Sequence, residues 1–156
     1  MERSTEKSFI RVKPLRDKVK LPVRAHESDA GIDFYWNPSK PVKIINIHSA
    51  QNSLLETGVA IEIPEGTMLE VKNKSGIASK DQLVVGACVV DHGYSGEVFI
   101  DLHNVGEFTK TLKRGQKIAQ GVLVPVLTPK IEVIDYIPYE GKSTRGSGGF
   151  GSTGKA

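Results

Sequence analysis

The amino-acid sequence predicts a nearly all-β domain, and three observations support this. Sixteen glycines and eight prolines divide the 156 residues into short runs. Several runs alternate apolar and polar residues with the period of two that is typical of half-buried strands. Turn residues separate these runs at short intervals, as in sandwiches, jelly rolls and barrels. The chain length suits a single domain with its own hydrophobic core.

The middle of the chain is expected to alternate strands with turns and one short helix. Residues 59–63 form a strand that ends at the Pro-Glu-Gly turn of residues 64–66, and residues 67–71 form the returning strand. A helix fits only residues 74–81, and it would be short. Residues 83–90 are small and apolar between polar turns, which is compatible with a strand buried on both faces.

Two further strands are expected toward the C-terminus. Residues 97–102 alternate, so that Val98, Ile100 and Leu102 share one face. Residues 131–137 form the last expected strand. From residue 141 onward the pattern breaks, and the composition is typical of a mobile tail.

Composition limits the classes of function. The hydrophobic fraction of 38% and the charged fraction of 25% are ordinary for a soluble globular protein. A net charge of +3 without a basic run favours a small anionic ligand over nucleic acid. The single cysteine and the spacing of the four histidines argue against a disulfide and a zinc site. The absence of long apolar stretches and of a signal peptide predicts a cytoplasmic protein without a membrane partner.

The glycine-rich tail carries the side chains needed to close over a nucleotide. Arg145 can pair with phosphate oxygens through its planar fork. Phe150 can stack on a base, and Ser152 and Thr153 can donate hydrogen bonds to phosphate. Glycine permits the close backbone approach that such a wrap requires. The alternative is an inert, disordered Gly/Ser tail or an expression scar.

Two interior segments place charge beside glycine. Asp33 follows Gly31, and by itself this pattern most resembles a loop acid that caps a turn. Lys74, Ser75 and Gly76 precede the expected helix, which is the layout of an anion site at a helix N-terminus. Simple N-capping by Ser75 is the alternative, and both can hold together.

Residues 85–96 form the richest interior segment. A strand of small residues leads to Asp91, a tight turn with Tyr94, and a second strand, so a β-hairpin with both side chains at its mouth is expected. Small side chains would let the backbone present N–H and C=O groups to a flat base edge. A solvated hairpin tip is the alternative. Residues 114–120 add two cations and two amides, including Gln120, at what reads locally as a surface turn entering a strand.

Taken in order, these segments resemble the five motifs of the trimeric dUTP pyrophosphatase (dUTPase) family. The connecting residues 57–66 are also typical of that family. The resemblance covers nearly the whole chain from about residue 10. Five motifs in order are far more specific than any one of them. The motifs stand at residues 30–34, 74–78, 88–96, 115–120 and 145–154.

The resemblance implies a jelly-roll-like (β-clip) fold and a nucleotide reaction. Residues 1–140 would form the β domain, and residues 141–156 a flexible C-terminal arm that closes over the active site. The family forms homotrimers whose active sites are shared between subunits. Its reaction converts dUTP and water to dUMP and pyrophosphate with Mg²⁺, which limits uracil in DNA and supplies dUMP for dTMP synthesis. If the source is viral, the host cytoplasm or nucleus would be the compartment.

The resemblance also implies roles for individual residues. Asp91 would be the general base for the water that attacks the α-phosphorus. Tyr94 would lie against the deoxyribose and exclude a 2′-hydroxyl, while backbone groups of Cys88 and Phe99 would read the uracil edge. Asp33 would organise the site near the sugar and the phosphate-binding loop. Mg²⁺ would be held by phosphates and waters, with no direct protein ligand. The expected substrate contacts are Lys74, Ser75, Gly76, Cys88, Tyr94, Phe99, Gln120, Arg145, Phe150, Gly151, Ser152 and Thr153.

The chain departs from the family pattern in four places. Lys74 and Lys117 stand where arginine is usual, and lysine keeps the charge but loses the bidentate fork. Cys88 stands where glycine is common. Gly93 replaces the usual acid between Asp91 and Tyr94. The proposed base, the ring and the arm are all retained.

The residues leave three other functions to be weighed against this one. A dCTP deaminase shares the fold, but it needs an acid at the base ring, and Asp91 with the complete arm favours phosphate chemistry. A regulatory protein on the same scaffold would use nucleotide-gated contacts, with residues 46–53 as a possible partner surface. A plain β-sandwich interaction module would leave five ordered motifs to coincidence.

Overall fold

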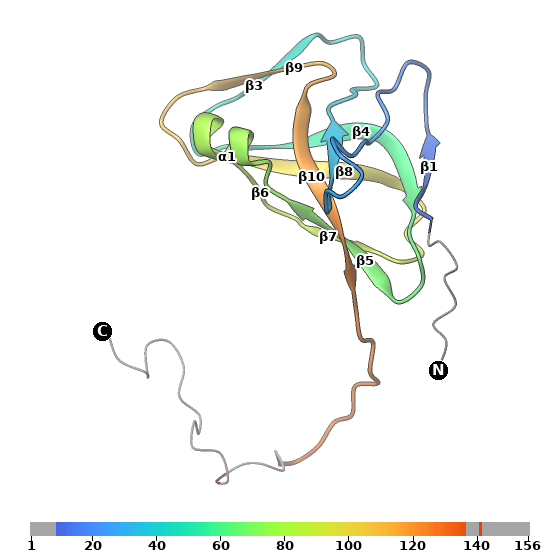
Figure 1. Ribbon diagram of the computed structural model, residues 1–156. Coiled ribbons are helices and arrows are strands. Elements are labelled where there is room, and N and C mark those ends of the chain that lie inside the picture. The colour runs from blue at the N-terminus through green and yellow to red at the C-terminus, as the bar shows by residue number, and fades with distance from the viewer. Residues whose placement is uncertain (1–8, 137–140, 142–156) are drawn as a thin grey trace.

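The computed structural model describes residues 9–136 and 141, and within them it contains ten strands and one short helix (Figure 1). The expected helix over residues 74–81 is confirmed as α1. The elements are β1 (Arg11–Pro14), β2 (Gly31–Tyr35), β3 (Ile44–Ile47), β4 (Asn52–Glu62), β5 (Thr67–Lys72), α1 (Ser75–Asp81), β6 (Leu83–Val85), β7 (Val89–Asp91), β8 (Glu97–Asn104), β9 (Lys110–Lys113) and β10 (Lys117–Pro125).

The strands form two four-stranded antiparallel sheets and a smaller third sheet. One large sheet has the order β1-β4-β8-β6 and the other the order β2-β10-β5-β7. The pair β3-β9 is the third. The predicted all-β, jelly-roll-like fold is therefore confirmed. No helix in the described part of the chain is long and apolar enough to cross a membrane.

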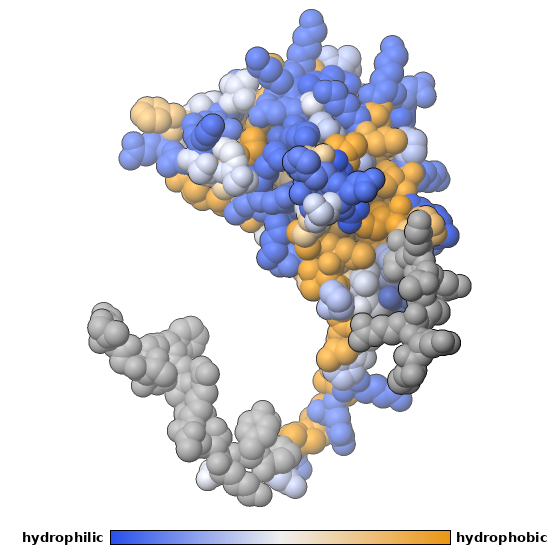
Figure 2. Space-filling model, in the orientation of Figure 1, coloured by the Kyte–Doolittle hydropathy of each residue, from blue (hydrophilic) through white to orange (hydrophobic). Residues whose placement is uncertain are grey.

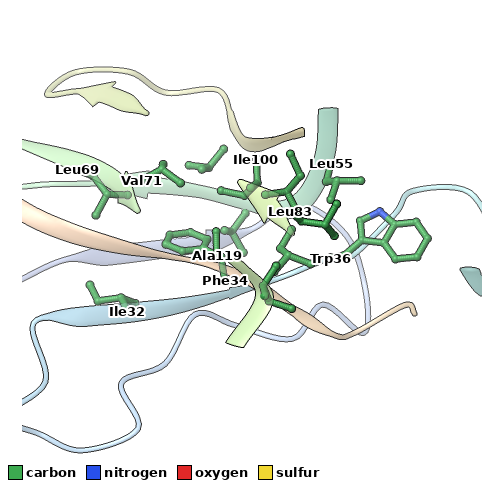
Figure 3. Packing of buried hydrophobic residues seen from close by; sticks show 14 of the residues in the cluster. Ile32, Phe34, Trp36, Leu55, Leu69, Val71, Leu83, Ile100 and Ala119 are labelled. Carbon is green, nitrogen blue, oxygen red and sulfur yellow. The ribbon is translucent and has the colours of Figure 1, made fainter. Parts of the chain in front are cut away.

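The core lies where the large sheets face each other, and alternation along the strands fills it. In β8 the even-numbered Val98, Ile100 and Leu102 are buried, as the sequence predicts. They belong to the same cluster as Phe34 of β2 and Leu69 of β5 (Figure 3). Burying apolar side chains from both sheets is the main force that holds the two layers together.

The single strand expected over residues 83–90 is wrong. The segment is divided into β6 and β7, which belong to different large sheets. At the break, the Gly86 N–H donates to the Asp101 carbonyl of β8, whereas the Cys88 carbonyl accepts from the Val71 N–H of β5. The small side chains of residues 86–88 let the backbone pass from one sheet to the other, and Val89 is exposed rather than buried.

The strand at residues 67–71 is present as β5, but it does not pair with the strand before it. β4 lies in one large sheet and β5 in the other, where β5 pairs with β10 and β7. The turn between them contains Gly66 with a φ of 73°, and the Gly66 carbonyl accepts from the Val126 N–H. The turn therefore carries the chain between the layers instead of closing a hairpin.

The last expected strand, over residues 131–137, is wrong for the residues that the structure describes. Residues 131–136 have no strand structure, and Ile131 is 97% exposed. From residue 127 the chain runs away from the two sheets (Figure 1), carrying apolar side chains on its surface (Figure 2). A strand requires a neighbouring strand for its backbone hydrogen bonds, and this segment has none within the described residues.

A pair of isoleucine substitutions tests the assignment of the core. Ile100→Ala should lower the free energy of unfolding by about 2–5 kcal/mol, because it leaves a cavity at a fully buried position. Ile44→Ala removes the same atoms at a position that is 54% exposed, and it should cost less than about 1 kcal/mol. Urea denaturation of both variants measures the difference, and equal losses would contradict this description of the core.

Candidate functional site

The predicted site residues gather into two groups on the chain. The first group, called here the carboxylate cluster, joins three of the sequence motifs at one end of β5. The second surrounds the turn between β7 and β8 and is called the β7–β8 mouth. The carboxylate cluster contains Asp33, Lys74, Ser75, Gly76, Lys117 and Gln120, and the β7–β8 mouth contains Cys88, Asp91, Tyr94 and Phe99.

Asp33 is the centre of the carboxylate cluster. It lies within β2 and is only 5% exposed, so its assignment as a loop acid capping a turn is wrong. Lys74 Nζ lies 2.9 Å from its Oδ1, and Lys117 Nζ lies 2.7 Å from its Oδ2. These are the two lysines that stand where the sequence resemblance leads us to expect arginine. Each ammonium group meets one carboxylate oxygen, a geometry that does not require the guanidinium fork.

The charges of this cluster are unequal. Burial raises the pKa of Asp33, but the hydrogen bonds and positive charges of Lys117 and Lys74 outweigh burial and hold the pKa below its usual range. The hydrogen bond and charge of Asp33 raise the pKa of Lys117. One carboxylate thus faces two ammonium groups, which leaves a net positive charge that suits an anionic ligand.

Gln120 connects the strands of the cluster to the helix. Its Nε2 donates to the Asn73 carbonyl at 2.9 Å, directly before Lys74. Its Oε1 lies so close to Gly31 that a Cβ there would come within 2.1 Å. The glycine of the first motif thus leaves the space that the Gln120 amide occupies, and the Gln120 amide holds the loop before α1.

Ser75 does not cap the helix. Lys74 occupies the N-cap position with extended backbone angles, and no side chain there accepts a capping hydrogen bond. Ser75 is the first helical residue and is exposed. The predicted N-cap role is wrong, because Lys74 occupies the N-cap position and the helix begins at Ser75.

The β7–β8 mouth begins with a tight turn. The Tyr94 N–H donates to the Asp91 carbonyl at 3.2 Å, and Gly93 has a φ of 87°. A positive φ at the third residue of a four-residue turn favours glycine over any acid. The departure from the family pattern at Gly93 therefore has a conformational reason. Asp91, at the first position of the turn, is exposed.

Tyr94 is folded back toward the start of β8. Its hydroxyl donates to the Glu97 carbonyl at 2.9 Å, and the side chain is 47% exposed. A Cβ at Gly96 would lie 2.5 Å from the Tyr94 Oη, so the ring can adopt this position only beside glycine. The ring is thus anchored through its hydroxyl and remains accessible.

The predicted β-hairpin is opened rather than continuous. Val85 pairs with Leu102, and continuing this register would set Cys88 opposite Phe99. No backbone hydrogen bond joins Cys88 to Phe99 among the described residues, because β7 leaves β8 to pair with β5. The two strands diverge at the position where the sequence predicts that a base edge is read.

One chain holds Asp91 and Lys74 at different levels of β5, although Cys88 lies beside Val71, close to the level of the carboxylate cluster. Asp91 pairs with Met68 near the start of β5, whereas Lys74 follows its last residue, Lys72. Four residues of strand separate these levels by about 13 Å. Beside Tyr94 lies a groove of about 510 Å³ whose lining includes Arg11, Lys13 and His92, which the sequence did not single out. Only proximity in the fold reveals them.

The remaining predictions concern the arm and the metal. Arg145, Phe150, Gly151, Ser152 and Thr153 lie outside the described residues, so their predicted roles stay predictions. Among the residues that are described, no group of three or more His, Cys, Asp or Glu side chains could hold a metal ion.

Asp33→Asn should lower the free energy of unfolding at neutral pH by about 1–3 kcal/mol, because two ammonium groups lose their charged partner. Since the folded-state pKa of Asp33 lies below the unfolded value, its contribution is present above about pH 4 and is lost as the pH falls through the folded pKa. The difference from wild type should therefore shrink in acid. Urea denaturation at a series of pH values tests this, with the exposed Asp17→Asn as control; a difference that stays constant into acid would refute it.

Comparison with known proteins identifies relatives of the whole chain. A family model described as dUTPase matches residues 17–154. A deoxyuridine 5'-triphosphate nucleotidohydrolase of Clostridium tetani is 40% identical over 148 residues, which are 94% of this chain and 97% of that protein. The protein of the same name from Solanum lycopersicum is 36% identical over 146 residues, which are 94% of this chain and 82% of that protein.

Solved structures agree with the sequence relatives. A Staphylococcus bacteriophage 80alpha dUTPase with dUPNHPP superposes with a TM-score of 0.81 at 27% identity, covering 94% of this chain and 99% of that chain. For the fold alone, a dUTPase of S. aureus phage phi11, described with a structural Mg(II) ion, gives a TM-score of 0.73 at 24% identity, covering 83% and 99%. Because the family match runs through most of the sequence and the relatives align over nearly its full length, this chain belongs to the dUTPase family.

Proposed function

We propose that this chain hydrolyses dUTP to dUMP and pyrophosphate. The observation that carries the proposal is the turn that holds an exposed Asp91 three residues from an exposed and anchored Tyr94, beside the divergence of β7 and β8. Family membership and the bound nucleotide analogue named for the phage 80alpha relative support the same substrate.

Asp91 acts as the general base in this proposal. Its carboxylate takes a proton from a water molecule, whose oxygen then attacks the α-phosphorus. The bond between the α-phosphorus and the oxygen that bridges to the β-phosphate breaks, and pyrophosphate leaves. The exposed position of Asp91 at the end of β7 leaves room for both the water and the triphosphate.

Selectivity for deoxyuridine follows from the opened hairpin. Backbone groups of Cys88 and Phe99 read the uracil edge, so the amine of cytosine leaves buried groups unpaired. The 5-methyl group of thymine clashes with the narrow opening. Tyr94 packs against the deoxyribose and leaves no space for a 2′-hydroxyl, a role that its fixed ring position supports.

The carboxylate cluster binds the triphosphate. Its net positive charge attracts the anion, while Ser75, Gly76 and Gln120 hold the α- and β-phosphates, and Lys74 adds charge from its place beside Asp33. In the C-terminal arm (residues 141–156), Arg145, Ser152 and Thr153 bind the γ-phosphate, Phe150 stacks on uracil, and Gly151 is a further substrate contact. Mg²⁺, when bound to the phosphates, neutralises part of their charge and keeps several waters in its shell.

The complete site is shared between subunits of a homotrimer. The separation of about 13 Å between the levels of Asp91 and Lys74 supports this, because the general base of one chain can then act with phosphate contacts from another. The exposed apolar side chains of Leu127, Ile131 and Val133 are further support, since a partner subunit would bury them.

Asp91→Asn should abolish turnover while leaving dUTP binding mostly intact, because asparagine fills the same space but cannot accept the proton. A fall in kcat of at least about a hundredfold is expected for the loss of a general base. Pyrophosphate release measures turnover, and calorimetric titration with dUTP measures binding. Equal loss of turnover and of dUTP binding would show that Asp91 is not the general base.

Removal of residues 145–156 should leave a folded trimer with little activity. Mixing this truncated chain with the Asp91→Asn chain should restore activity, because a shared site can take its mouth from one subunit and its arm from another. Random exchange at equal amounts gives about a quarter of the sites both intact parts. Full activity of the truncated chain alone would make the arm inert, and no recovery on mixing would contradict sharing between mouth and arm.

A further inference from the structure

The residue that holds the Tyr94 hydroxyl is itself held by an ion pair outside the candidate site. Glu97 supplies the carbonyl that accepts from Tyr94. Its carboxylate receives two hydrogen bonds from Arg16, from Nη2 to Oε1 at 2.7 Å and from Nη1 to Oε2 at 3.1 Å. A fork that meets both oxygens fixes the plane of the carboxylate as well as its distance.

Arg16 is fixed in turn by the protein backbone. Its Nε and Nη2 both donate to the Asn37 carbonyl, at 3.2 and 2.7 Å. The Arg16 side chain is 24% exposed and that of Glu97 14%. In such surroundings an ion pair is screened less than one at the surface, and the geometry is set by several contacts rather than one.

The ion pair lies beside a bulge in the ladder between β4 and β8, where the buried Thr57 hydroxyl also donates to the Val98 carbonyl. The pairing of β4 with β8 shifts register between Glu56 and Ala60, and Ala60 is the partner of Glu97 beyond this bulge. Within the bulge, the Gly58 N–H donates to Glu97 Oε1 at 2.7 Å. The carboxylate therefore fills the gap in the ladder at the point where β8 starts.

We propose that Arg16 is a positioning residue for Tyr94 and thereby contributes to the preference for deoxyribose over ribose. This inference rests on the proposed function. The fork of Arg16 fixes the Glu97 side chain and the start of β8, and the Glu97 carbonyl then fixes the Tyr94 ring. Without the fork, the start of β8 can shift relative to the bulge, and a displacement of the ring by a fraction of an ångström reopens space beside the 2′-carbon of the sugar.

The test compares kcat/KM for dUTP with kcat/KM for UTP. Arg16→Lys keeps the charge but loses the fork, and it should lower the dUTP preference about fivefold, as expected for one lost hydrogen bond. Tyr94→Phe removes the hydroxyl at the other end and should act in the same direction. If Arg16 acts through Tyr94, the preference for dUTP over UTP in the double variant should be little lower than in the more severe single variant.

Arg114→Lys is the matched control. The Arg114 guanidinium also donates to backbone carbonyls, those of Pro38, Lys40 and Val42, and none of these hydrogen bonds involves Glu97 or Tyr94. This variant should lose stability and keep the wild-type preference. If Arg16→Lys does not fold, Glu97→Gln carries the same test, since it removes the ion pair and keeps an acceptor for the Gly58 N–H.

An unchanged preference in Arg16→Lys, with dUTP still hydrolysed, would overturn the inference. The inference would also be overturned if the fold-loss of dUTP preference in the double variant equalled the product of the two single fold-losses. Arg16 and Tyr94 would then act independently. If the unmodified chain released no pyrophosphate from dUTP, the proposed function itself would fail, and this inference with it.

Discussion

The buried Asp33 carboxylate is the interaction on which the arrangement of the site depends. A carboxylate at 5% exposure is unfavourable without positive partners. Lys74 and Lys117 supply them, and in doing so they tie the loop before α1 and the start of β10 to β2. Gln120 lies opposite Asp33 in the strand register, and its side-chain amide donates to the backbone carbonyl of Asn73 in the same loop. Segments distant in sequence thus meet at one charge, and the excess of positive charge is available to a ligand.

A second constraint is the passage of the chain between the two large sheets. At residues 86–88 the backbone leaves β8 for β5, so β7 and β8 diverge below Asp91 and Tyr94. The divergence creates an opening between β7 and β8. Both strands keep backbone hydrogen bonds, because β7 pairs with β5 and β8 pairs with β4. The divergence also leaves Asp91 beside Met68 near the start of β5, whereas Lys74 follows the last residue of that strand.

Local sequence patterns predict the elements well and their partners poorly. The burial of Val98, Ile100 and Leu102 follows from alternation alone, and the short helix follows from its flanking residues. Nothing near residue 86 signals a change of sheet, since a small apolar run fits a strand in either layer. Residues 131–136 have a strand-like composition, but a strand also needs a neighbour, which the described chain does not provide.

The sequence predicts which residues belong to the candidate site, but it does not predict which of them contact one another. The motifs identify Asp91, Tyr94 and Gln120 in order along the chain, yet Asp33 resembles a loop acid because its lysine partners are distant in sequence. Arg16 belongs to none of the motifs, and only the fold reveals its ion pair with Glu97. Gly93 is a departure from the family pattern in sequence, and its φ shows that the turn favours glycine at this position.

Pyrophosphate release from dUTP, dCTP, dTTP and UTP, measured in parallel with Mg²⁺, tests the central claim most directly. The account predicts rapid release from dUTP alone, since the mouth rejects the cytosine amine, the thymine methyl group and the ribose 2′-hydroxyl for three separate physical reasons. The account would be contradicted if none of the four nucleotides released pyrophosphate and dCTP released ammonia instead. The chain would then be a deaminase with the same fold.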